Sequence, residues 1–300
     1  MIAYLAATAA LLMVTIIWGS TFPLSKIVLE QIPPMYYLGI RYAITTVIMI
    51  FIFPKQLYVH LKPTFRSAFP LGIAIFFAYL TQTLGVNETT ASKAGFFTAF
   101  SVVLVPLLLF MISKKRPPYS LIIGVVLALI GLTLMSGLLD EQIHFNRGDF
   151  LVLLCAFGFA IQVILVARLN PNSNPASVAT IQFATVSLFS FLIAFVLEEI
   201  PSFHQIRPQV WWIILFLSLF GTAFAYTIQI IAQKEMSAGQ AAMILTFEPV
   251  FTAIFSYYIL KEVQTTGTLI GGVFIIVGML ISQFYPVFEV KFRKALPFLK

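Results

Sequence analysis

The sequence predicts an all-α integral membrane protein in which ten transmembrane helices form two inverted five-helix repeats. Three observations predict this fold class: an apolar composition, a series of long apolar runs, and an internal repeat. Of the 300 residues, 60% are hydrophobic and 10% are charged, whereas soluble domains contain about 45–50% and about 25% by the same counts. A soluble core cannot bury this much apolar surface, so we expect most of the chain to lie in the lipid bilayer.

Long apolar runs separated by short polar connectors recur along the whole chain. Each run approaches the roughly 20 residues that a helix needs to cross the hydrocarbon layer. The runs lack the alternation of outer-membrane strands, so helices are predicted. The first run is not read as a cleaved signal, because no basic residue precedes it and nine spans follow. The predicted spans are, in order, Ala3–Leu24, Met35–Phe53, Ser67–Val86, Ala91–Ile112, Tyr119–Leu138, Asp149–Leu169, Ala176–Leu197, Trp211–Ala232, Ala238–Leu260 and Thr266–Pro286.

An internal repeat relates the two halves of the chain. Shifting the sequence by 147 residues superposes spans three to five on spans eight to ten without a gap. A unit of five spans is odd, so the second copy must enter the membrane from the opposite side. We therefore predict a first repeat at residues 1–138, a second at 149–286 and a basic cytoplasmic tail at 287–300. The matched pairs include Tyr79 with Tyr226, Gln82 with Gln229, Glu88 with Glu235, Gly124 with Gly271 and Gly131 with Gly278.

The distribution of basic residues predicts the orientation. Lys and Arg concentrate in the connectors on the side of the N-terminus and in the tail, as at Lys55, Lys62, Arg66 and Lys114. Cytoplasmic connectors carry such an excess, so both termini are predicted to be cytoplasmic. The net charge of +7 is accounted for by this asymmetry, and no nucleic-acid partner is expected.

Four segments carry a family resemblance. They are "WGSTFPLSK" at 18–26, "YLGIRYAITT" at 37–46, "ETTASKAGFFTAFSVVLVPLL" at 88–108 and its repeat partner "EMSAGQAAMILTFEPVFTAIFSYYILKE" at 235–262. In their order, spacing and duplication the chain resembles the drug/metabolite transporter superfamily, specifically its EamA-type members. The resemblance covers the chain to about Pro286.

The resemblance implies a ten-helix transporter with a central cavity, in which spans five and ten lie at the periphery. It also implies a bacterial plasma-membrane protein that moves a small metabolite, such as an amino acid or a related compound, with export as the expected direction. Inverted repeats independently favour secondary active transport by alternating access, with the substrate near the midplane. The alternatives are a channel and an intramembrane enzyme acting on a lipid-linked substrate.

Two charged residues lie deep inside predicted spans. A charge at the centre of a membrane helix is costly, so Glu248 and Arg41 are expected to face protein or a wet cavity. In one hypothesis both face the cavity, where Arg41 holds a carboxylate of the cargo and Glu248 holds an ammonium group or a coupled proton. In the other they form a structural ion pair between the second and ninth spans.

Further polar and aromatic residues are candidates for the cavity wall, and for each of them packing between helices is the alternative role. Tyr79 and Gln82 share a helix face, as do Tyr226 and Gln229. Pro106 and Pro249 are expected to kink the fourth and ninth spans. The remaining candidates for the wall are Trp18, Ser20, Thr21, Thr98, Ser101 and Thr252.

Motifs for other chemistries are missing from the sequence. There is no nucleotide-binding glycine loop, no HExxH pair and no GxSxG elbow, and the single Cys155 excludes a CxxC pair. We therefore predict no catalytic residues, no metal and no cofactor. Gly267 and Gly271 form a GxxxG pair that is typical of close helix contacts, either within the chain or at a homodimer seam.

Overall fold

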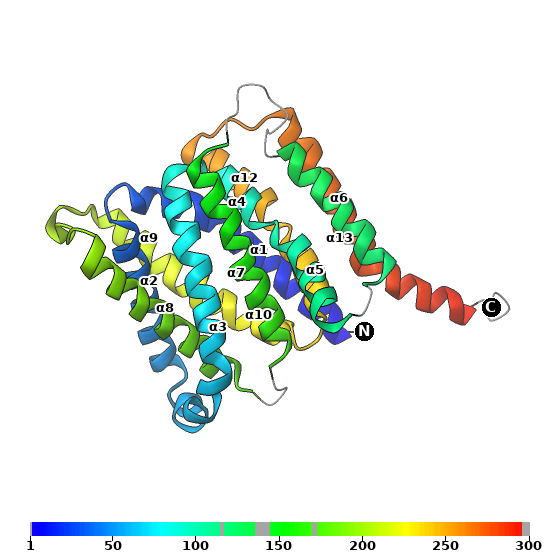
Figure 1. Cartoon of the computed structure of the whole chain (residues 1–300), viewed down its shortest axis with the longest axis horizontal. Helices are drawn as coiled ribbons and strands as arrows, with labels where there is room; N and C mark the ends of the chain where they lie inside the picture. Colours follow the sequence, from blue (N-terminus) through cyan, green and yellow to red (C-terminus); the bar gives the residue numbers. More distant parts are fainter. Residues whose placement is uncertain (1, 115–116, 136–144, 170–172, 296–300) are drawn as a thin grey trace.

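The computed structural model describes residues 2–114, 117–135, 145–169 and 173–295, and helices form all of the regular structure within these ranges (Figure 1). The first half contains α1 (Ile2–Leu29), α2 (Pro34–Ile52), α3 (Pro54–Glu88), α4 (Ala91–Thr98), α5 (Ser101–Ser113) and α6 (Tyr119–Met135). The second half contains α7 (Arg147–Ala167), α8 (Pro175–Leu197), the 3-10 turn η1 (Phe203–Gln205), α9 (Pro208–Ser218), the π-helix η2 (Leu219–Phe224), α10 (Ala225–Ala232), α11 (Ala238–Leu245), α12 (Glu248–Leu260) and α13 (Thr266–Ala295).

The predicted all-α membrane fold is confirmed. Eight helical stretches among the described residues are long and apolar enough to cross a membrane, and residues 119–135 and 266–282 form two shorter apolar helices. These are the ten predicted spans. The last part of the fifth, residues 136–138, lies outside the described residues.

Three helices are longer than predicted, and the first of them, α1, continues past the predicted end at Leu24 to Leu29. Helix α3 begins at Pro54 and so includes the segment that was expected to be a connector. Thr64, Ala68 and Leu71 are buried, while Lys62 and Arg66 are exposed, which is the spacing of one helix face. The charged residues Lys55, Lys62 and Arg66 interrupt the apolar run in this segment, so the run of apolar residues did not predict its helix. Helix α13 likewise continues past the predicted end and protrudes from the bundle (Figure 1).

The fourth and ninth spans are each broken into two helices at equivalent positions. Moving α4 (91–98) and α5 (101–113) by 238 − 91 = 147 residues reproduces the bounds of α11 (238–245) and α12 (248–260). The two C-caps also correspond, since Lys114 and Lys261 both adopt a left-handed backbone, with φ of 57° and 58°. The break at Ala99–Phe100 lies well before Pro106, so that proline does not cause it.

Helices α6 and α13 pack side by side at the edge of the bundle (Figure 1). A side-chain carbon added at Gly124 would lie 2.8 Å from the carbonyl oxygen of Gly278, and one added at Gly131 would meet that of Gly271. Gly124, the earlier glycine of α6, thus faces Gly278, the later glycine of α13, and Gly131 faces Gly271. The two helices are therefore antiparallel. Because they are the fifth spans of the two repeats, the repeats run in opposite senses. The same contacts bury Gly271 within the chain, so it is not available for the homodimer seam considered above.

Polar contacts join the two halves at the end of the bundle where α1 ends, here called the distal end. The carboxylate of Asp149 in α7 is fully buried, lies 2.8 Å from Lys93 Nζ in α4 and accepts a hydrogen bond from Thr89. Lys26 Nζ, at the end of α1, donates to the carbonyl oxygen of Thr89. At the opposite end, where α1 begins, Gln240 Nε2 donates to Tyr4 Oη at 3.2 Å. Gln240 is the repeat equivalent of Lys93, 147 residues later in the sequence. Equivalent positions of the two repeats therefore form an ion pair at one end of the bundle and a neutral hydrogen bond at the other.

Glu262, in the second half, caps the N-terminus of α4 in the first half. Its carboxylate accepts hydrogen bonds from the backbone N–H groups of Ala91 and Ser92 at 2.9 and 3.1 Å. Replacing Glu262 with glutamine removes a charge from a helix N-terminus, where it contributes about 1 kcal/mol. We expect a slightly lower thermal unfolding temperature for the purified protein. Glu235→Gln, on an exposed carboxylate, is the matched control, and equal stability of the two variants would contradict this capping role.

Candidate functional site

A narrow cavity of about 30 Å³ lies at the centre of the bundle, and both halves line it. Its wall is built from α1, α3, α4 and the start of α5 in the first half, together with α7, α10, α11 and the start of α12 in the second. Both helix breaks reach this wall, through Ala99 in the first half and Glu248 in the second. The cavity therefore lies where the two repeats meet.

Most of the residues proposed from the sequence for the wall lie on it. Three of the proposed residues lie off it: Ser20, Arg41 and Thr252. Thr252 is fully buried against Gly95 of α4 and donates to the carbonyl oxygen of Glu248. Those on the wall are Trp18, Thr21, Tyr79, Gln82, Thr98, Ser101, Tyr226, Gln229 and Glu248.

Glu248 is placed on the wall by the break in the ninth span. Thr246 and Phe247 end the first segment, so α12 starts at Glu248, with Pro249 in its first turn. Proline suits this position, where its missing N–H is not needed. A carboxylate in the first turn is also favoured by the helix dipole. Within the described part of the chain the carboxylate of Glu248 forms no ion pair and accepts no hydrogen bond. It is a half-buried acceptor directed to the cavity.

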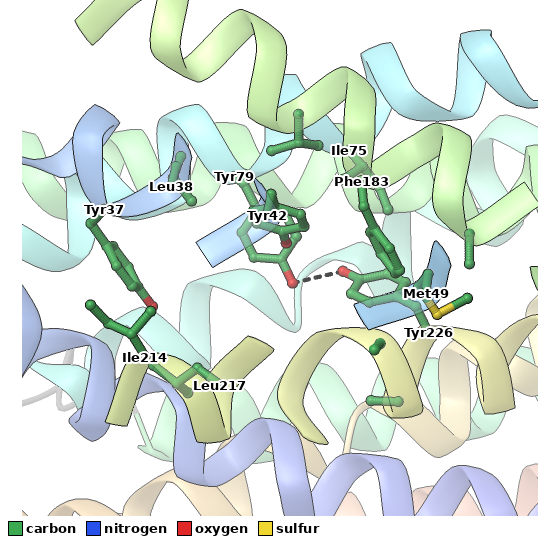
Figure 2. Packing of buried hydrophobic residues seen from close by; sticks show 14 of the residues in the cluster. Tyr37, Leu38, Tyr42, Met49, Ile75, Tyr79, Phe183, Ile214, Leu217 and Tyr226 are labelled. Carbon is green, nitrogen blue, oxygen red and sulfur yellow. Dashed lines mark hydrogen bonds between the residues drawn. The ribbon is translucent and has the colours of Figure 1, made fainter. Parts of the chain in front are cut away.

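Tyr79 and Tyr226 meet near the axis that relates the repeats. Their hydroxyl oxygens are 2.8 Å apart, and the two residues are separated by 147 positions, so each is the repeat equivalent of the other (Figure 2). Tyr42 and Phe183 pack around them, with ring centroids 5.2 Å from Tyr79 and 5.9 Å from Tyr226. The pair therefore joins the halves and forms part of the cavity wall.

Removing one hydroxyl of this pair is a conservative test of the contact. Tyr226→Phe keeps the ring and loses the hydrogen bond, which contributes about 0.5–1.5 kcal/mol. We expect a modest fall in thermal stability and no further fall when Tyr79→Phe is added, because both variants remove the same bond. Thermal unfolding of the two single variants and the double variant measures this coupling. Additive losses would contradict a direct Tyr79–Tyr226 bond.

Trp18 is fixed by a π-helical segment that the sequence did not predict. Its indole N–H donates to the carbonyl oxygen of Gly221 at 2.9 Å, within η2. A side-chain carbon at Gly221 would lie 3.0 Å from Thr21 and 3.3 Å from Arg41, so the close approach of three helices depends on a glycine there. π-helical turns occur frequently at functional sites. Here the turn orients Trp18 on the wall.

Two buried amides leave hydrogen-bonding capacity at the cavity. Gln229 Nε2 donates to Gln162 Oε1 at 3.3 Å, while Gln229 Oε1 and Gln162 Nε2 have no partner among the described residues. Exchanging O and N in both side chains reverses the bond but again leaves one donor and one acceptor unused. Gln82, by contrast, donates to Thr98 Oγ1 at 3.0 Å.

Arg41 lies behind the wall rather than on it. Its side chain is 3% exposed, its Nε donates to Thr222 Oγ1 and its Nη1 to Tyr37 Oη, both at 3.0 Å. The guanidinium carbon also lies 5.7 Å from the ring centroid of Tyr79. No ion pair joins Arg41 to Glu248, both of which the structure describes. The hypothesis of a structural ion pair between these two residues is therefore wrong.

The wall also contains residues that the sequence analysis missed. The most polar of them is Gln162, in α7 of the second repeat, and Phe159 lies one turn before it. A glutamine in the middle of an apolar span was the available signal for Gln162. The others are Ala99, Val163 and Leu245. Within the described ranges no group of three or more His, Cys, Asp or Glu side chains could hold a metal ion.

Comparisons with known proteins identify a family, transporter relatives and a shared fold. The EamA-like transporter family matches twice, at residues 5–137 and 146–284. A protein of Archaeoglobus fulgidus described as an uncharacterized transporter is 32% identical over 276 residues, covering 92% of this chain and 85% of its own length. The uncharacterized transporter YetK of Bacillus subtilis is 28% identical, covering 92% and 86%. A solved crystal structure shares the fold, with a TM-score of 0.74 and 16% identity over 92% of this chain and 96% of the other.

Proposed function

The chain belongs to the EamA-like transporter family, and we propose from this premise that it is a secondary active transporter that works by alternating access. The proposed cargo is a small metabolite that carries an amine, such as an amino acid or a related compound. The proposed direction is export across the bacterial plasma membrane, with both termini in the cytoplasm. The observation that carries the proposal is Glu248, a carboxylate that has no ion-pair or hydrogen-bond partner among the described residues, on the wall of a cavity between two inverted repeats.

The ends of the cavity support an exchange between two states. At the distal end, the ion pair of Lys93 with Asp149 and the bond from Lys26 to Thr89 hold α1, α4 and α7 together. Towards the other end, a second pocket lined by Ile230, Gln233 and Lys234 lies one turn beyond Gln229. In the proposed cycle the distal contacts break as the contact between Gln240 and Tyr4 tightens. Because these contacts occupy repeat-equivalent positions on α4 and α11, one rocking motion exchanges them.

The proposed role of Glu248 couples transport to protons. A carboxylate that faces an enclosed cavity binds either an ammonium group or a proton, because an uncompensated charge there is costly. Glu248 binds the cargo in one state and a proton in the other, so cargo and protons cross the membrane in opposite directions. This exchange uses the proton gradient to drive export.

Reconstituted liposomes provide the decisive experiment. We expect saturable uptake, accelerated exchange when cargo is present on both sides, and a response to an imposed pH gradient, measured over a panel of amines, amino acids and other metabolites. Flux that does not saturate and shows no exchange acceleration would indicate a channel. A lack of flux for the whole panel, with protein shown to be folded, would overturn the transporter proposal for these cargo classes.

A further inference from the structure

The charge of the cavity wall narrows the class of cargo. Glu248 is the only residue with a formal charge among those that line the cavity, all of which the structure describes. The rest of the wall consists of aromatic rings, amides, hydroxyls and aliphatic side chains. We infer that the site selects an organic cation whose ammonium group meets Glu248 and which carries no free carboxylate. This inference rests on the proposed transporter function and narrows its cargo to amines that lack a free carboxylate, so free amino acids are not the preferred cargo.

The nearest intramembrane cation does not provide a site for a carboxylate. Arg41 is 3% exposed, and two of its nitrogens donate to Tyr37 and Thr222. Tyr79 contacts the guanidinium group and lines the cavity. A cargo carboxylate could pair with Arg41 only after this ring and these bonds were displaced. A carboxylate left unpaired in the cavity would lose its hydration without compensation.

The lysines nearest the distal end are engaged elsewhere. Lys93 pairs with Asp149 at 2.8 Å, and Lys26 donates to backbone carbonyl groups of α3 and the turn that follows it. Neither lysine lines the cavity. In the first hypothesis above, Arg41 holds a carboxylate of the cargo and Glu248 holds its ammonium group. The structure keeps Glu248 in this role but not Arg41.

The aromatic residues beside Glu248 favour the same class of cargo. Trp18 and Tyr226 have ring centroids 4.9 Å apart, and Tyr79 lies 6.3 Å from Tyr226. All three line the cavity with Glu248. The faces of such rings attract ammonium groups and also bury an apolar body.

A matched set of probes tests this inference in the reconstituted full-length protein. Phenylalaninamide and phenylalanine share ring, chain and ammonium group and differ in whether an amide or a carboxylate is present. 2-Phenylethylamine lacks both groups, and 3-phenylpropanoate has only the carboxylate. We expect the two amines without a carboxylate to exchange with half-saturation at least about tenfold lower than phenylalanine, because of the unpaired carboxylate. We expect no saturable exchange of 3-phenylpropanoate.

Two variants separate Glu248 from Arg41. Glu248→Gln should remove the preference for the amines, whereas Arg41→Gln should leave the ratio of phenylalaninamide to phenylalanine half-saturation unchanged. If Arg41→Gln unfolds, ligand-induced thermal stabilisation of the wild-type protein by the four probes supplies the same ranking. Phenylalanine binding as tightly as its amide would overturn the inference but keep the transporter. The inference also fails if none of the amines is exchanged or stabilises the protein while other metabolites are transported.

Discussion

The Glu248→Gln variant is expected to lose most saturable transport, with the ratio of maximal rate to half-saturation about 10- to 100-fold below wild type. A hydrogen bond to a charged group contributes about 1.5–3 kcal/mol, and every 1.4 kcal/mol corresponds to about a factor of ten. Glutamine keeps the shape of the side chain but can accept no proton and offers no charge to an ammonium group. Because the carboxylate forms no ion pair and accepts no hydrogen bond in the described part of the chain, we expect folding to be little affected.

The measurement is uptake into liposomes with and without a pH gradient. Glu235→Gln makes the same chemical change on an exposed residue and should leave both uptake and its pH response unchanged. Wild-type flux and wild-type pH dependence in Glu248→Gln would exclude the proposed coupling role. Loss of the pH response with flux retained would assign the proton, but not the cargo, to this carboxylate.

The Gly271→Ala variant is expected to lower the stability of the protein by about 1–3 kcal/mol, a typical cost of overpacking a tight contact. The added methyl group would collide with the carbonyl oxygen of Gly131 and lie 2.7 Å from the side chain of Met135. A carbonyl oxygen in a helix cannot rotate away, so α6 and α13 must separate. Separation also removes dispersion contacts, which drive helix association in lipid.

The neighbouring glycine provides a matched control. A side-chain carbon at Gly272 meets only Val250 Cγ2, at 3.8 Å, which is an ordinary contact. Gly272→Ala should therefore be neutral or slightly stabilising, since alanine is the better helix former. Thermal unfolding of the two variants in detergent measures the difference. Equal stability would mean that the antiparallel packing of α6 on α13 is wrong.

Several residues of the cavity wall could be predicted from the sequence. Tyr79, Gln82 and Glu248 were found because polar side chains in apolar spans are costly and the repeat marks their equivalents. Arg41 was expected on the wall for the same reason, but the structure places it behind the wall. The depth of a residue in the membrane follows from its position within a span, but the direction in which its side chain points from the helix axis does not. The π-helical turn at η2 and its packing on α2 place Arg41 behind Tyr79.

The sequence by itself determined the membrane class, the ten spans, the duplication and the inverted sense of the halves. These features depend on run length, hydropathy and parity, which are properties of a single chain read in order. Only the tertiary structure decided which polar side chains share a cavity, that Tyr79 pairs with Tyr226, and that Gln162 joins Gln229. These contacts depend on how helices distant in sequence rotate and pack against one another, and this is settled by the shapes of all the buried side chains together.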